Sequence, residues 1–126
     1  MIEIIVGTNK ELRTKKYREV LKNLSGEIIS LDDISGSLLG LEAYIYPSLF
    51  SAVPPIVQAT YLIEESSIEL TKELLKKIVS SPTIFILEER EMSSHLVKFI
   101  EKEGGIVHQT KEPKDPPKAN TIFGVV

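Results

Sequence analysis

The chain alternates five times between short apolar runs and longer segments with the apolar spacing of a helix. The runs cover residues 2–6, 27–30, 56–63, 83–87 and 106–108, and the helical patterns cover residues 10–24, 38–46, 66–79 and 92–102. An uncharged run such as 83–87 is typical of a strand covered on both faces, and strands that alternate with helices pair in parallel. The pattern predicts an α/β fold of three layers, with a five-stranded parallel sheet between helices.

Composition limits the classes of protein to consider. At 126 residues the chain has about the length of one domain, and it contains no cysteine and only two histidines, so a structural zinc site is not expected. The net charge of −3 predicts no strong nucleic-acid footprint, so any DNA contact by this domain is expected to be weak. Met1 leads directly into a strand-like run and no apolar stretch reaches membrane-spanning length, which favours a cytoplasmic protein.

The character of the chain changes near residue 111. Residues 111–118 are charged and rich in proline, which favours an extended linker, and residues 119–126 are apolar again. We predict one domain over residues 1–110, with residues 111–126 forming a linker and the start of a second domain that this chain lacks.

The first strand-to-helix turn, residues 7–16, is where α/β proteins often bind phosphate. A P-loop needs a second glycine five residues after the first, followed by lysine and a hydroxyl residue, but position 12 is leucine. We therefore predict an ordinary turn, with weak anion binding by its amides as the alternative. The helix that follows is basic, and a solvated outer face is favoured over a phosphate contact; its cations are Lys10, Arg13, Lys15, Lys16, Arg18 and Lys22.

Acidic pairs follow three of the expected strands: Asp32-Asp33, Glu64-Glu65 and Glu88-Glu89. Carboxylates at this edge of a parallel sheet can hold magnesium, so a metal-dependent nuclease or phosphotransferase using Asp32, Glu64 and Glu88 is one hypothesis. Solvated or helix-capping roles are favoured, because carboxylates at strand ends commonly stabilise the next helix. His95 is expected at the surface, and no catalytic triad, cofactor site or metal site is assigned.

A segment rich in proline precedes the third strand. Leu49 and Phe50 lie between Pro47 and the doubled proline at 54–55, which shape a short turn because proline fixes φ and donates no hydrogen bond. Large apolar residues in such a turn belong either to the core or to a contact surface.

Four parts of the chain resemble the bacterial DNA polymerase III delta subunit, the clamp-loader component that binds and opens the sliding clamp. The similarity runs through nearly the whole chain, and its most specific element is the placement of Ser48, Leu49 and Phe50. The other parts are the strand and turn Ile4-Ile5-Val6-Gly7-Thr8-Asn9, the strand-helix unit 83–103 with Gly104-Gly105-Ile106-Val107 after it, and the terminal Asn120-Thr121-Ile122-Phe123.

The resemblance implies an AAA+/P-loop-NTPase-like first domain with a degenerate P-loop, followed by a lid domain. It implies a non-catalytic part of the DNA polymerase III holoenzyme, which acts in DNA replication and leaves ATP to other subunits. Ser48, Leu49 and Phe50 would bind the sliding clamp as an apolar plug, and C-terminal domains would bind the other clamp-loader subunits. The alternatives are the metal-dependent enzyme above and a nucleotide-binding regulatory domain.

Overall fold

The structure, a computed structural model, describes residues 1–31, 41–42, 44–46, 53–63 and 68–110. Its strands and helices follow one another as β1 (Ile2–Val6), α1 (Lys10–Leu21), β2 (Ile28–Ser30), β3 (Ile56–Thr60), α2 (Ile68–Ser80), β4 (Ile84–Glu89), α3 (Ser94–Lys102) and β5 (Ile106–Gln109). The strands form one five-stranded sheet in the order β2-β3-β4-β1-β5, and every neighbouring pair is parallel. The predicted five-stranded parallel sheet is confirmed.

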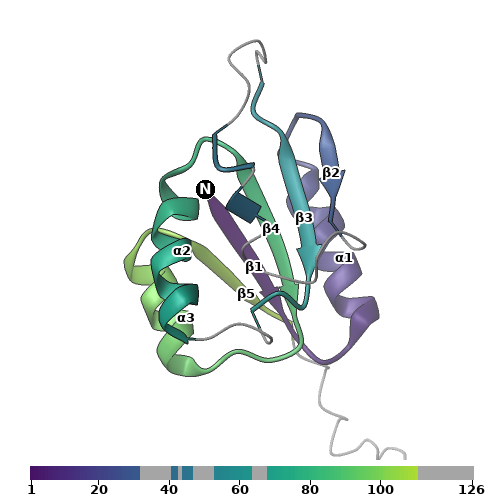
Figure 1. Cartoon of the computed structure of the whole chain (residues 1–126). Coiled ribbons are helices and arrows are strands. Elements are labelled where there is room, and N and C mark those ends of the chain that lie inside the picture. The colour runs from purple at the N-terminus through teal and green to yellow at the C-terminus, as the bar shows by residue number, and fades with distance from the viewer. Residues whose placement is uncertain (32–40, 43, 47–52, 64–67, 111–126) are drawn as a thin grey trace, which may run out of the picture.

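Helices cover both faces of the sheet, as predicted. Figure 1 shows α1 on one side and α2 with α3 on the other. Strand residues alternate between these layers: Ile5, Ile56 and Ile86 pack with Val20 of α1, whereas Ile4, Val57 and Phe85 belong to the larger core with Leu75 and Ile100 of α2 and α3. β4 is therefore apolar on both faces from Ile84 to Leu87, which explains the continuous apolar sequence of that run.

Three element boundaries differ from the predicted ones. β3 ends at Thr60 rather than at residue 63, because Tyr61 has a φ of 57° and leaves the strand direction. β4 continues to Glu89, so the last acidic pair lies inside the strand. In the predicted helix 38–46, Leu41, Glu42 and Tyr44 have 3₁₀ geometry. The rest of that helix before Leu41, the start of the capping box at Ser66 and the predicted linker at 111–126 lie outside the described residues.

Two glycines end α3 and lead into β5, as the sequence predicted. Gly104 has a φ of 102°, a conformation that side chains disfavour. Gly105 is close-packed, because a Cβ atom there would lie 2.6 Å from Cγ2 of Ile100 and 2.8 Å from Cγ2 of Ile2. The pair thus allows β5 to pass close to α3 and β1.

The amino end of β1 is tied to the end of α2. The Met1 amine donates to the carbonyl oxygens of Ile78 at 3.0 Å and Thr83 at 3.1 Å, and also to that of Ser81. Burial lowers the pKa of this amine, whereas the three carbonyl oxygens favour its charged form. These contacts define the amino edge of the sheet, opposite to the edge described next.

Candidate functional site

A polar network crosses the carboxyl edge of the sheet on the face that α1 covers. Ser30 of β2 donates from Oγ to Oε1 of Gln58 at 2.9 Å, and Gln58 of β3 donates from Nε2 to Oε2 of Glu88 at 3.1 Å. The parallel register places Ser30 beside Gln58, and Thr60 beside Glu88, on this face. The strand register therefore brings together three polar side chains that are distant in the sequence.

Arg13 of α1 completes this network from above the sheet. Its side chain is only 2% exposed, and its Nε lies 3.5 Å from Oε1 of Glu88. Its guanidinium donates to the Gly7 carbonyl oxygen and the Tyr61 hydroxyl. The Tyr61 ring also lies 4.4 Å from the Arg90 guanidinium. Arg13 was predicted to be solvated and that prediction is wrong, whereas Lys10, Lys15 and Arg18 are exposed as expected.

The neighbouring carboxylate, Glu89, fixes the turn after β3. Its side chain is fully buried, and Oε2 accepts hydrogen bonds from the backbone amides of Leu62 at 3.1 Å and Ile63 at 3.3 Å. The same turn includes Tyr61 with its positive φ. The prediction of solvated or helix-capping roles is therefore wrong for Glu88 and Glu89, because both lie inside a buried strand and bond to other parts of the fold.

The turn between β1 and α1 uses the amides that a phosphate would need. The Gly7 amide donates to the Glu89 carbonyl oxygen, and the amides of Glu11 and Leu12 donate to Oδ1 of Asn9, the N-cap residue. A Cβ atom at Gly7 would lie 1.9 Å from Oγ1 of Thr110, so the residue that follows β5 packs directly against this glycine. These contacts favour the ordinary-turn interpretation over anion binding.

At this edge the charges of Arg13 and Glu88 neutralise each other inside the domain. Arg13 places one buried cation against the Glu88 carboxylate, and burying either charge alone would be costly. Among the residues that the structure describes, no group of three or more His, Asp or Glu side chains could hold a metal ion. Of the proposed metal-binding carboxylates, Glu88 is engaged by Arg13 and Gln58, and Asp32 and Glu64 lie outside the described residues.

The predicted partner-binding residues Ser48, Leu49 and Phe50 also lie outside the described residues. The described residues on either side of them are exposed: Tyr46 is 84% exposed and Val53 is 46% exposed. Both belong to the region of the amino edge, before β3 begins at Ile56. His95 is exposed as predicted, and its Nε2 lies 2.8 Å from Nζ of Lys72.

Comparison of the chain with protein-family models, with curated proteins and with solved structures returned no match in any of the three. Across the described part of the chain, no helix has both the length and the apolar character needed to cross a membrane.

Sequence reasoning missed the network, although helical spacing contained a signal for it. Arg13 lies four residues before Tyr17 and seven before Val20, on the stripe of α1 that faces the sheet. A cation at such a position needs a buried anion opposite, and Glu88-Glu89, directly after an uninterrupted apolar run, is one of the acidic pairs that could supply it. Periodicity could thus have indicated the burial of Arg13, while its partner depended on the strand order.

Proposed function

We propose that this chain contains the first domain of a delta-type clamp-loader subunit, a non-catalytic module that binds the sliding clamp. The observation that carries the proposal is the buried Arg13–Glu88 network at the carboxyl edge. In a P-loop NTPase this edge holds the nucleotide phosphates and their metal ion. Here the domain's own guanidinium neutralises the carboxylate, so the edge is stable without either ligand.

The arrangement of the sheet supports an AAA+-like fold with a degenerate P-loop. β1 lies between β4 and β5, with β3 and β2 following β4 outward. This order differs from both common doubly wound orders, 3-2-1-4-5-6 and 2-1-3-4-5. The turn after β1 keeps the strand-turn-helix form of a P-loop and lacks its phosphate-binding residues.

The clamp-binding role is proposed for Leu49 and Phe50. The exposure of Tyr46 and Val53 supports it, because the segment between them begins and ends at the surface of the domain. An aromatic and a leucine entering an apolar pocket on a partner are typical hot-spot anchors, each contributing about 2 kcal/mol. The proposed role needs only apolar contact by Leu49 and Phe50, so clamp binding requires no chemistry at the Arg13–Glu88 network.

Replacement of Phe50 by alanine tests the plug. The chain should be retained on immobilised sliding clamp from the same organism, and Phe50→Ala should weaken binding roughly 30-fold, the equivalent of about 2 kcal/mol. Surface plasmon resonance with both proteins measures this change. Ile106→Ala is the matched control, because Ile106 is an exposed apolar residue on β5, which the strand order places at the opposite end of the sheet from β2 and β3, and this variant should bind as the wild type does. Equal binding by the Phe50 variant would remove the plug assignment.

Titration with ATP and magnesium separates the proposal from its two alternatives. Calorimetry with magnesium-ATP should give no binding heat, because Arg13 and the Asn9 cap already engage the groups that would contact phosphates. Measurable ATP affinity would instead favour a nucleotide-binding regulatory domain. With millimolar magnesium alone, amide chemical shifts at the ends of β3 and β4 should stay unchanged, and shifts there would favour the metal-dependent enzyme.

A further inference from the structure

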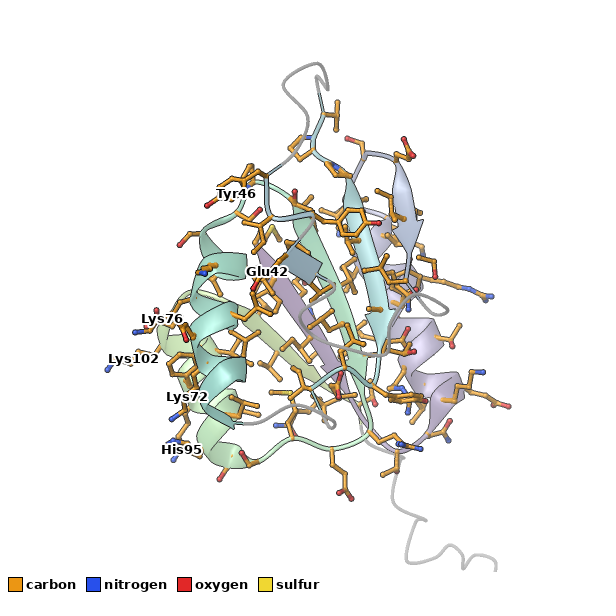
Figure 2. The ribbon with its side chains drawn as sticks, viewed as in Figure 1. Glu42, Tyr46, Lys72, Lys76, His95 and Lys102 are labelled. Carbon is orange, nitrogen blue, oxygen red and sulfur yellow. The ribbon has the colours of Figure 1, made fainter. Side chains whose placement is uncertain are left out.

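Two helices bring three lysines and a histidine together on the outer layer of the domain. Lys72 and Lys76 lie four residues apart on α2, and His95 and Lys102 lie seven residues apart on α3, so each pair shares one face of its helix. Figure 2 shows these four side chains along the same side of the molecule. We call Lys72, Lys76, His95 and Lys102 the seam stripe, because they follow the line where α2 and α3 meet.

Lys72 is held in place within the seam stripe. Its Nζ lies 2.8 Å from Nε2 of His95 and 5.5 Å from the centre of the Phe99 ring, and its side chain is half-buried. Contacts with an imidazole nitrogen and an aromatic face restrict the ammonium group without neutralising its charge. Less conformational entropy is therefore lost when this lysine binds an anion than when a fully mobile lysine does.

No carboxylate neutralises the seam stripe among the side chains that the structure describes. The ion pairs of those side chains involve Arg13, Lys16 and His108, and none involves a lysine of the stripe. The basic helix α1 differs, because Lys16 lies 3.5 Å from Glu19 and the cations of its outer groove alternate with Glu11 and Glu19. The three lysines of the seam stripe thus take no part in those ion pairs, whereas Lys16 of α1 does.

The extent of the stripe favours a polyanion over a single phosphate. His95 and Lys102 are separated by about 10 Å along α3, since a helix rises 1.5 Å per residue. The exposed large apolar residues of the described chain are Met1, Ile28, Tyr46, Val53 and Ile106, and none lies on α2 or α3. A protein partner normally covers an apolar centre with a polar rim, whereas contacts to a phosphate backbone are polar and need no apolar centre.

We propose that the seam stripe binds the phosphate backbone of duplex DNA without reading its sequence. The inference rests on residues separate from Leu49 and Phe50 and does not depend on the clamp proposal. Lys72, Lys76 and Lys102 each contact one phosphate, so the slope of log K against log salt should be about −2.7. A slope of that size corresponds to roughly 40-fold weaker binding on going from ~50 mM to ~200 mM salt.

Fluorescence anisotropy of a labelled mixed-sequence duplex, measured with the full chain at several salt concentrations, tests the proposal. Lys102→Gln should reduce the magnitude of the slope by about 1, and the triple variant Lys72→Gln, Lys76→Gln, Lys102→Gln should bring it near zero. The triple arginine variant keeps the charges and should keep the slope. The matched control, Lys10→Gln with Lys15→Gln, removes exposed cations of α1 on the other side of the sheet and should retain the wild-type slope.

Several results would overturn the assignment. The assignment of DNA binding to the seam stripe is wrong if the wild-type protein does not bind duplex at low salt. It is also wrong if the triple glutamine variant keeps the wild-type slope. If the slope falls more in the α1 control variant than in the triple glutamine variant, the DNA contact must be assigned to α1 instead. If polyglutamate displaces the labelled duplex as well as unlabelled duplex does, an acidic protein would be the favoured partner instead of DNA. Clamp retention, measured on the same triple variant, should be unaffected, which separates this outcome from failure of the plug.

Discussion

Replacing Arg13 with methionine should lower the free energy of unfolding by about 3–5 kcal/mol. Methionine fills much of the same volume but leaves the Glu88 carboxylate buried without its cation, and it removes the donors to the Gly7 carbonyl oxygen and the Tyr61 hydroxyl. Because domains of this size are stable by only about 5–15 kcal/mol, the loss should be evident as a large fall in the urea midpoint. Far-UV circular dichroism during urea unfolding measures it.

The double variant Arg13→Met, Glu88→Gln isolates the charge effect. Glutamine keeps a hydrogen-bond partner for Gln58 and removes the unpaired charge, so the double variant should be more stable than Arg13→Met alone. Lys15→Met, an exposed substitution on the same helix, should change stability by less than about 0.5 kcal/mol. A loss below about 1 kcal/mol in Arg13→Met would show that the Arg13–Glu88 network is not needed for stability.

Replacing Phe85 with alanine should lower the free energy of unfolding by about 3–5 kcal/mol. Phe85 is fully buried at the start of the central strand β4, within the core between the sheet and helices α2 and α3. Because neighbouring strands hold the backbone of β4 from both sides, the core cannot collapse fully into the space that the ring leaves. The same urea experiment provides the measurement.

Ile106→Ala is the control for Phe85→Ala. Ile106 is 45% exposed on the edge strand β5, so truncating it removes little buried apolar surface and should cost well under 1 kcal/mol. Similar losses in the two variants would mean that the core does not depend on the central strand. A larger fall in the free energy of unfolding for Phe85→Ala than for Ile106→Ala would agree with β4 being central and β5 being an edge strand.

Local patterns were sufficient to predict most elements but not all of their ends. The apolar run at 83–87 indicated β4, yet the strand continues through Glu88 and Glu89, because their backbone pairing with β1 outweighs the low strand propensity of glutamate. Residues 61–63 read as strand by composition, but Tyr61 turns the chain and Glu89 holds the turn. Both errors arose where contacts between distant residues decided where a strand ends: backbone pairing with β1 for β4, and the Glu89 carboxylate for the turn after β3.

Some features of the candidate sites could be predicted from the sequence, and others could not. The incomplete P-loop follows from the identity of residue 12 alone, and the placement of Leu49 and Phe50 was noticed from their prolines. The burial of Arg13 and the contact of Lys72 with His95 were not predicted, because each joins residues from different elements. A charged residue looks the same in a sequence whether it faces solvent or a buried partner.

The sequence by itself determined the class of fold, because the alternation of apolar runs with helical spacing requires parallel strands between two helical layers. It also determined that the first turn lacks the residues of a P-loop. Only the tertiary structure decided that Arg13 meets Glu88 and that α2 and α3 align their lysines with His95. Such meetings depend on strand order, register and helix packing, which involve residues far apart in the chain and which no local pattern specifies.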